Sequence, residues 1–242
     1  MRVFRGRAAT IEADRAVSDR LLSSAADGDP AVRVWRPHRQ VAFGRRDCRL
    51  EGYDVAREIA REYGFPPIER GVGGRAVAYD GETTLAFARA DPVADFRRGT
   101  DERYERATAT LERALAELGL EPRRGEPADA FCPGTHSLSV AMAESNANAP
   151  TERKVVGIAQ RIRQDAALTA GIVLVEANDD LVGALEGVYD ALGVGFDPAA
   201  VGSVAGAGGP ADPEAVRATI EAALVGDATT TAESVPDRLE SP

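Results

Sequence analysis

Segments with strand and helix character follow one another along this 242-residue chain without the strict strand–helix–strand alternation of a parallel sheet. Apolar residues at helical spacing, closed by Gly119, predict the clearest helix over 101–118. Other helices are predicted over 11–26, 53–63 and 181–192 and from Asp212, and strands over 31–36, 40–43, 76–79, 83–88, 137–142, 154–162 and 168–175. Asp80-Gly81 is typical of a hairpin turn between two of these strands. The order favours an α+β fold, with a largely antiparallel mixed sheet flanked by helices.

The length of the chain suits a single large domain with a sizeable core, and we expect that domain over residues 1–226. Residues 227–242 are polar and lack apolar periodicity, which predicts a disordered tail. Residues 144–150 are rich in Ala, Asn and Ser and are predicted to form an extended hairpin loop.

Composition excludes several classes of function. A net charge of −10 argues against nonspecific binding of nucleic acid, which needs a basic surface. Two cysteines and two distant histidines predict neither a disulfide framework nor a metal site. The chain has no apolar run of membrane-spanning length, so we expect a cytoplasmic protein without a membrane partner. Acidic residues outnumber basic ones, and all basic residues but one are arginine, which together indicate a halophilic host.

Lys154 is the single lysine among 29 basic residues. Lysine offers a compact ammonium with three rotatable donors, which arginine cannot supply. Lys154 opens an apolar, strand-like run, and alternation predicts one face made of Lys154, Val156, Ile158, Gln160 and Ile162. An ammonium at the end of an apolar row suits a ligand with an apolar chain and a carbonyl head. The alternative is a half-buried strand whose lysine reaches solvent.

Two turns are further candidates for the site. The glycine-rich run 69–77 exposes backbone N–H groups that can bind an anion or a carbonyl, although glycine is also common in turns without a ligand. In Phe131-Cys132-Pro133-Gly134-Thr135, proline and glycine at the central positions predict a type II turn that presents the Cys132 thiol as a nucleophile. An isolated cysteine is otherwise a small buried apolar residue, and His136 is a candidate base for it.

Three motifs in order resemble the superfamily of lipoate–protein ligases, octanoyltransferases and biotin–protein ligases. They are E-R-G-V-G-G-R-A-V at 69–77, D-G-E-T-T-L-A-F at 80–87 and K-V-V-G-I-A-Q-R at 154–161. The resemblance covers about residues 1–195 and implies the ligase-like catalytic fold. It also implies that the acyl chain and its carbonyl contact the following residues: Arg70, Gly73, Gly74, Arg75, Ala76, Lys154, Gly157 and Ala159.

Within that superfamily, C-P-G-T-H-S-L-S at 132–139 is most similar to the amidotransferase branch. The resemblance implies that Cys132 takes an octanoyl or lipoyl group from the glycine-cleavage H protein as a thioester. A lysine of a lipoyl domain in a 2-oxoacid dehydrogenase would then accept it. Lys154 would polarise the acyl carbonyl, with backbone N–H groups near Gly73 and Gly74 assisting. This reaction implies no cofactor.

The motifs also depart from the family pattern, with Glu69 for an arginine, Arg75 for a glycine, Tyr79 for a histidine and Ala170 for another histidine. These changes bear on the handling of adenylate. The alternative function is therefore an ATP- and Mg²⁺-dependent lipoate–protein ligase, with a separate accessory subunit. A non-catalytic module that binds acyl groups is a third reading, and the G-R-G-R loop of biotin–protein ligases is absent.

The proposed chemistry imposes one geometric condition. In a simple hairpin of 137–142 and 154–162, Cys132 and Lys154 would lie at opposite ends, about 20 Å apart at the rise of a strand. The segment around Cys132 must therefore fold back across the sheet for the two side chains to meet.

Overall fold

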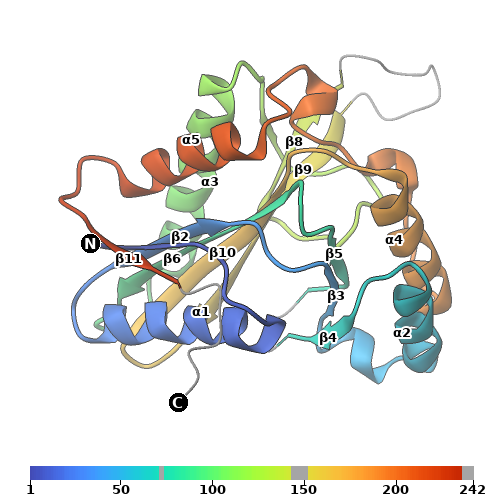
Figure 1. The fold of residues 1–242 in the computed structure, drawn as a ribbon, viewed down its shortest axis with the longest axis horizontal. Coiled ribbons are helices and arrows are strands. Elements are labelled where there is room, and N and C mark those ends of the chain that lie inside the picture. Colours follow the sequence, from blue (N-terminus) through green and yellow to red (C-terminus); the bar gives the residue numbers. More distant parts are fainter. Residues whose placement is uncertain (71–73, 143–151, 236–242) are drawn as a thin grey trace.

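A computed structural model describes residues 1–70, 74–142 and 152–235 of the chain. Its main element is an eight-stranded sheet with the order β11-β1-β2-β6-β10-β9-β8-β7 (Figure 1). These strands are β1 (Arg2–Arg5), β2 (Ala31–Trp35), β6 (Thr84–Pro92), β7 (Arg123–Arg124), β8 (Ser137–Ala141), β9 (Glu152–Ile162), β10 (Ala166–Leu174) and β11 (Thr231–Ser234). Strand β1 pairs in parallel with β2 and β11, and the other neighbours in the sheet are antiparallel. The predicted α+β class with a largely antiparallel mixed sheet is confirmed.

A second, three-stranded sheet lies beside the first. It consists of β3 (Gln40–Phe43), β4 (Pro67–Glu69) and β5 (Val77–Tyr79), with β3 in the centre. Strand β3 runs parallel to β4 and antiparallel to β5. The two sheets form the two sides of the candidate site described below.

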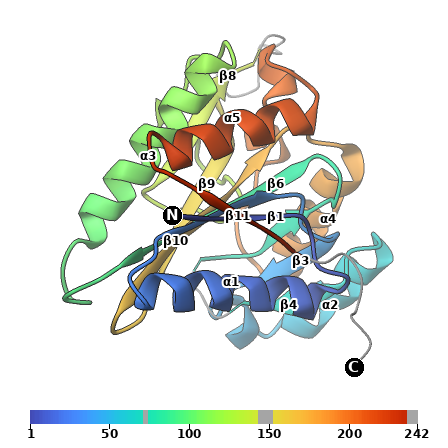
Figure 2. The same cartoon turned by 60° about the vertical axis from the view of Figure 1, so that its left-hand side comes forward.

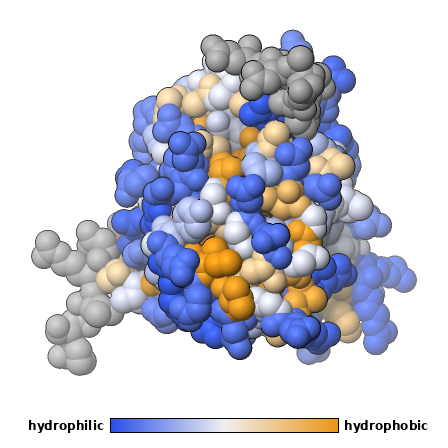
Figure 3. All heavy atoms as spheres, turned by 90° about the vertical axis from the view of Figure 1, so that its right-hand side faces the viewer, coloured by the Kyte–Doolittle hydropathy of each residue, from blue (hydrophilic) through white to orange (hydrophobic). Residues whose placement is uncertain are grey.

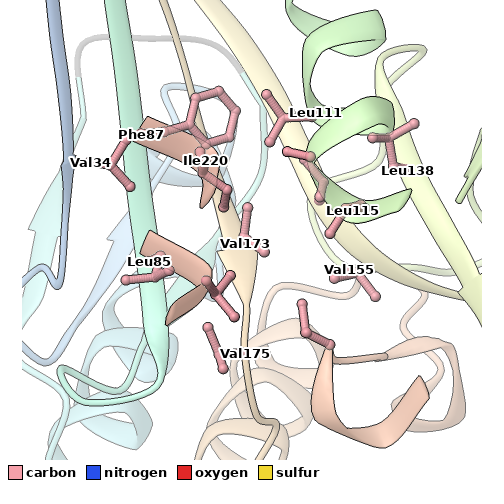
Figure 4. Packing of buried hydrophobic residues seen from close by; sticks show 14 of the residues in the cluster. Val34, Leu85, Phe87, Leu111, Leu115, Leu138, Val155, Val173, Val175 and Ile220 are labelled. Carbon is pink, nitrogen blue, oxygen red and sulfur yellow. The ribbon is translucent and has the colours of Figure 1, made fainter. Parts of the chain in front are cut away.

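Helices cover both faces of the large sheet. Helices α3 (Thr100–Glu117) and α5 (Pro213–Val225) lie on one face, and α1 (Ile11–Ala26) lies on the other (Figure 2). Beneath α3 and α5, buried side chains from the helices meet those of β6, β8, β9 and β10 (Figure 4). Leu111 and Leu115 are fully buried there, because their spacing places both on the inner stripe of α3.

The helix ends follow the local sequence. The Thr10 hydroxyl accepts a hydrogen bond from the N–H of Ala13 at the start of α1. Asp212 does the same for Glu214 at the start of α5, and Pro213 occupies the first helical position as predicted. Both caps satisfy N–H groups that have no partner inside the helix.

Helices α2 (Tyr53–Glu62) and α4 (Asp179–Ala191) pack against each other beside the small sheet. Their inner faces enclose a second core that includes Phe43, Phe65 and Tyr189. Hydrophobic side chains also form small groups between hydrophilic ones on the outer surface of this side (Figure 3). Val55, at the start of α2, is 58% exposed.

The hairpin predicted at Asp80-Gly81 is wrong. Strand β5 pairs with β3 in the small sheet, whereas β6 pairs with β2 and β10 in the large one. The carboxylate of Asp80 accepts hydrogen bonds from the N–H groups of Glu82, Thr83 and Thr84. These bonds hold a turn that carries the chain from one sheet to the other, so that the flanking strands never pair.

The prediction of a disordered tail is wrong for part of 227–242. Thr231–Ser234 forms β11, which pairs with β1 from Arg2↔Thr231 to Arg5↔Ser234. An edge strand is held by backbone hydrogen bonds, and its side chains show no apolar alternation here, which explains why the sequence pattern missed it. Val235, directly after β11, is buried beside α1. The predicted loop at 144–150 lies outside the described residues.

None of the helices in the described part of the chain has the length and apolar character that a membrane span requires.

Candidate active site

A cavity of about 450 Å³ opens between the large sheet, α1 and the small sheet. Apolar side chains such as Ile11, Trp35 and Leu168 form part of its wall. Arg70, Cys132 and Lys154 contribute polar groups to the same wall. The volume and the mixture of a mainly apolar lining with a few polar groups are typical of a site for a small organic ligand.

Cys132 has an unusual backbone conformation. Its φ is +43°, in the left-handed region that residues other than glycine seldom adopt. Gly134 does not have a positive φ, so the predicted type II turn, which requires one at that position, is wrong. The N–H of Cys132 donates to the hydroxyl of Tyr189 at 2.5 Å, and that hydroxyl donates to the carbonyl oxygen of Ala76 at 2.9 Å. A buried side chain of α4 thus holds the left-handed residue in place.

The thiol of Cys132 lies against the glycine-rich segment. Nη2 of Arg70 lies 3.1 Å from Sγ and also donates to the carbonyl oxygen of Arg75 at 2.6 Å. Burial acts to lower the pKa of Arg70, but the combined effect of Cys132, Tyr79 and Tyr189 outweighs it, so the pKa lies above its ordinary value. A Cβ atom on Gly74 would stand 2.7 Å from Sγ, so only glycine allows this approach.

The ammonium of Lys154 is fully buried and makes three hydrogen bonds. It donates to Oε2 of Glu126 at 2.6 Å and to the carbonyl oxygens of Phe131 and Cys132, both at 2.9 Å. The reading of Lys154 as a lysine that reaches solvent is therefore wrong. The condition that the Cys132 segment fold back is met, because Nζ binds the carbonyl of Cys132 itself.

A β-bulge sets which side chains share a face with Lys154. Ser139 pairs with Lys154 and Leu138 pairs with Val156, which leaves Val155 as the extra residue. The predicted face of alternate residues is therefore wrong. Val156 and Ile158 pack toward α3 and α5, and Gln160 bonds Arg103 and the backbone of Thr100 in α3. Gly157, Ala159 and Arg161 lie on the same side of the strand as Lys154, and Ile158 and Gln160 also contribute to the cavity wall.

Most of the predicted site residues meet at this cavity. Its wall contains Arg70, Gly74, Cys132, Lys154, Gly157 and Ala159. Arg75 and Ala76 lie outside the wall. The Arg75 side chain turns to the buried carboxylate of Asp47, 3.2 Å away, and Ala76 belongs to the second core. Gly73 falls outside the described residues.

His136 makes no hydrogen bond to the thiol of Cys132. Its ring stacks on Tyr104, with centroids 3.8 Å apart and an interplanar angle of 7°. No hydrogen bond joins His136 to Cys132, and both residues lie in the described part of the chain. The structure therefore gives no support to His136 as a base for Cys132.

Sequence reasoning missed two residues that contact the Cys132 segment. Tyr189 looks like one more apolar position of α4. Glu126 lies in an irregular stretch, and the chain has 39 acidic residues among which nothing marks it. Neither carries a local signal, because long-range folding brings both to the site. Among residues 1–70, 74–142 and 152–235, no group of three or more His, Cys, Asp or Glu side chains is placed to hold a metal ion.

Comparison with known families agrees with this geometry. The model of the lipoyl protein ligase A/B catalytic domain matches residues 11–223. The chain belongs to this family. The match includes the three motifs and every described residue of the cavity wall named above, so the resemblance seen in the sequence is confirmed.

Curated relatives point to one branch of the family. A protein of Exiguobacterium sibiricum, named octanoyl-[GcvH]:protein N-octanoyltransferase, is 32% identical over 149 residues. A protein of Geobacillus kaustophilus with the same name is 28% identical over 151 residues. Each alignment covers 60% of this chain but only 49% and 48% of the relative, so the chain spans about half the length of the curated relatives it matches. The resemblance to the amidotransferase branch is confirmed.

Solved structures share the fold. A lipoate–protein ligase A bound with ATP superposes with a TM-score of 0.73 at 18% identity, over 98% of this chain and 89% of that one. A bipartite lipoate protein ligase from Thermoplasma acidophilum, described with its E2 lipoyl domain, gives a TM-score of 0.68 at 16% identity. That match covers 98% of this chain and 87% of the other. At these identities, the likeness concerns the fold alone.

Proposed function

We propose that this protein transfers an octanoyl or lipoyl group from the glycine-cleavage H protein to lipoyl domains of 2-oxoacid dehydrogenases, through a thioester on Cys132. The observation that carries the proposal is the position of the thiol. Sγ lies at the wall of a ligand-sized, mainly apolar cavity, 3.1 Å from the guanidinium of Arg70. The names of the curated relatives support the donor and the acyl group.

The reaction proceeds in two steps of acyl transfer. In the first, Sγ attacks the carbonyl carbon of the acyl amide, the bond to the donor lysine nitrogen breaks, and the thiol proton ends on the leaving amine. In the second, the acceptor amine attacks the thioester, the bond to sulfur breaks, and a proton from the amine returns to Cys132. Arg70 stabilises negative charge on sulfur at the start of the first step and the end of the second.

Lys154 supplies positive charge beside the same segment. Its three donors are all engaged by Glu126 and the carbonyls of Phe131 and Cys132. An acyl carbonyl would take the place of one of these two carbonyl oxygens at the ammonium. The N–H of Gly74, from the segment against Sγ, is a second candidate donor to the oxyanion.

The test is the mass of the intact protein after incubation with octanoylated H protein in high salt, without ATP. We expect a gain of one octanoyl group that hydroxylamine removes, because a thioester is labile to that nucleophile. Cys132→Ser should show no gain. Cys48→Ser is the matched control, since Cys48 bonds the carbonyl of Gly44 outside the cavity, and it should acylate like the wild type.

The alternative is an ATP-dependent lipoate–protein ligase. It predicts no adduct on Cys132, and transfer to a lipoyl domain only when free acid, ATP and Mg²⁺ are supplied. That result would overturn the thioester. A non-catalytic acyl-binding module would bind the octanoylated protein and show neither adduct nor transfer.

A further inference from the structure

The segment from Gly125 to Ser137 forms a closed loop around the Lys154 ammonium. The N–H of Gly125 donates to the carbonyl oxygen of Ser137 at 2.9 Å, which joins the two ends. All three hydrogen bonds of the ammonium go to residues of this loop, namely Glu126, Phe131 and Cys132. Lys154 therefore fixes the segment that carries the nucleophile as well as supplying charge.

Glu126 is the anion that this arrangement needs. The side chain of Lys154 is 1% exposed, and Nζ lies 4.9 Å from the ring centroid of Phe131. A buried ammonium without a counter-charge is strongly disfavoured. Glu126, with 15% of its side chain exposed, is the acidic residue within ion-pair distance of Nζ in the described part of the chain.

The same carboxylate also holds the far side of the loop. Oε1 of Glu126 accepts from the N–H of Gly134 at 2.7 Å, and Oε2 accepts from the hydroxyl of Ser137 at 2.7 Å. Lys154 binds the carbonyl oxygens at and before Cys132, whereas Glu126 binds the amide two residues after it. Together the pair restrains both sides of a residue that is held in a left-handed conformation.

We propose that Glu126 is a positioning residue for acyl transfer, which acts through Lys154 and the Cys132 loop. The inference rests on the proposed function and assigns Glu126 no proton transfer. Its carboxylate supplies the counter-charge that holds the ammonium in place, and closes the loop so that Sγ stays against Gly74 and Arg70. Loss of the charge lets both the ammonium and the sulfur move, and small displacements of reacting groups cost a large part of the rate.

The first experiment compares single-turnover acylation of Cys132 in Glu126→Gln and in the wild type, at several concentrations of octanoylated H protein. We expect a maximal rate slower by roughly 10- to 100-fold, with half-saturation little changed, because Glu126 does not contact the acyl chain. Glu121→Gln is the matched control. Glu121 is exposed, lies five residues earlier in the chain and should leave the rate unchanged.

A double-mutant cycle separates positioning through Lys154 from a general loss of structure. If Glu126 acts through the ammonium, Glu126→Gln should add little to the defect of Lys154→Met, since the partner is already gone. If the rate loss of the double variant equals the product of the two single losses, the inference is overturned. Glu126→Asp, which keeps the charge on a shorter side chain, should recover part of the rate. If Glu126→Gln does not fold, Glu126→Asp takes its place in the comparison with the wild type and with Lys154→Met.

The single lysine allows a direct spectroscopic readout. Labelling with ¹⁵N-lysine places one ammonium signal in the spectrum, because Lys154 is the only lysine of the chain. Hydrogen bonding and burial should slow exchange of its protons with water, so that the signal is visible in the wild type and in Glu121→Gln. It should vanish or shift in Glu126→Gln. A wild type without a visible signal would contradict the buried ion pair.

The outcomes distinguish the two proposals. If the wild type forms no adduct, the thioester function fails. If the wild type forms the adduct and Glu126→Gln forms it equally fast, the function stands and the role of Glu126 is wrong.

Discussion

Arg70 places a permanent positive charge beside the Cys132 thiol, in surroundings that also include Tyr79 and Tyr189. Its guanidinium remains protonated at any relevant pH, and Nη2 lies 3.1 Å from Sγ of Cys132. The thiolate, and not the thiol, is the reactive form of cysteine. The contact therefore places a positive charge against the sulfur that the proposed reaction uses.

Replacing Arg70 by glutamine tests this contact. We expect iodoacetamide to alkylate Cys132 more slowly, on the order of tenfold, since one decade in rate corresponds to about 1.4 kcal/mol of lost stabilisation of charge on the attacking sulfur. Cys48 in the same molecule is an internal control, because its Sγ bonds the carbonyl of Gly44 and no guanidinium. Equal rates for Cys132 in both proteins would contradict the role of Arg70.

Gly74 is the residue on which the closeness of the thiol depends. Its φ is +93°, and an added Cβ would stand 2.6 Å from Nη2 of Arg70 and 2.7 Å from Sγ of Cys132. Gly74→Ala should therefore push the sulfur away and reduce acylation of Cys132 by at least tenfold, as expected for a displaced nucleophile. Gly28→Ala is the control, because its φ of +96° imposes a similar backbone strain while a Cβ there meets nothing within 4 Å. Intact-protein mass against time measures both variants.

At the scale of elements, the strands and helices were predictable where the sequence pattern is local. The helix over 11–26 begins and ends as predicted, and β3 spans its predicted residues, 40–43. Strands β1, β4, β7 and β11 were missed, because their formation depends on pairing with strands elsewhere in the chain. The turn at Asp80 shows the same limit, because a hairpin signal cannot reveal that its two strands belong to different sheets.

The site was predictable to a similar extent. Cys132, Lys154, Arg70 and Gly74 came from motifs and do meet at one cavity. The β-bulge at Val155, which turns Gly157 toward the Lys154 side, has no local signal, because it arises from the pairing with β8. Glu126 and Tyr189 are set by tertiary contacts alone.

The turn at Asp80 should make stability depend on pH. Burial acts to raise the pKa of Asp80, but hydrogen bonds from the Thr83 side chain and from three backbone amides outweigh it, so its pKa lies below the ordinary value. A lowered folded-state pKa gives stability that is present above the unfolded pKa, about 4, and is lost as pH falls through the folded one.

Asp80→Asn removes this charge while keeping the shape of the side chain. We expect it to lower the free energy of unfolding at pH 7 by roughly 1.5–3 kcal/mol, the range for hydrogen bonds to a charged group. The difference from the wild type should shrink below pH 4, where the native carboxyl takes up its proton. Urea unfolding at several pH values measures both. Asp54→Asn, at an exposed carboxylate of α2, should change little at any pH.

At the scale of the whole molecule, negative charge is in excess. The chain carries 39 acidic and 29 basic residues, and many of its ion pairs lie at the surface. Surface pairs contribute little and are weakened by salt, whereas repulsion among the surplus carboxylates destabilises the compact state. Screening should therefore favour folding.

Thermal unfolding in KCl tests this balance. Between about 0.1 M and 1 M salt the screening length falls from about 10 Å to about 3 Å, which removes most long-range repulsion. We expect Tm to rise by roughly 2–4 °C for each kcal/mol of repulsion relieved. A Tm that falls over this range would mean that surface ion pairs dominate, and would count against adaptation to high salt.

The burial of Lys154 also bears on whether one copy of this chain could acylate another. Under the proposed chemistry, the thioester is attacked by lysine amines, and the chain has one lysine, whose buried ammonium is engaged by residues of the Gly125–Ser137 loop. The 28 arginines do not substitute for it, because a guanidinium keeps its proton and is no nucleophile. Two copies that meet while carrying the acyl group thus have no lysine side chain to modify in each other. Under the proposed chemistry, this chain therefore offers no exposed lysine side chain for acylation by a second copy.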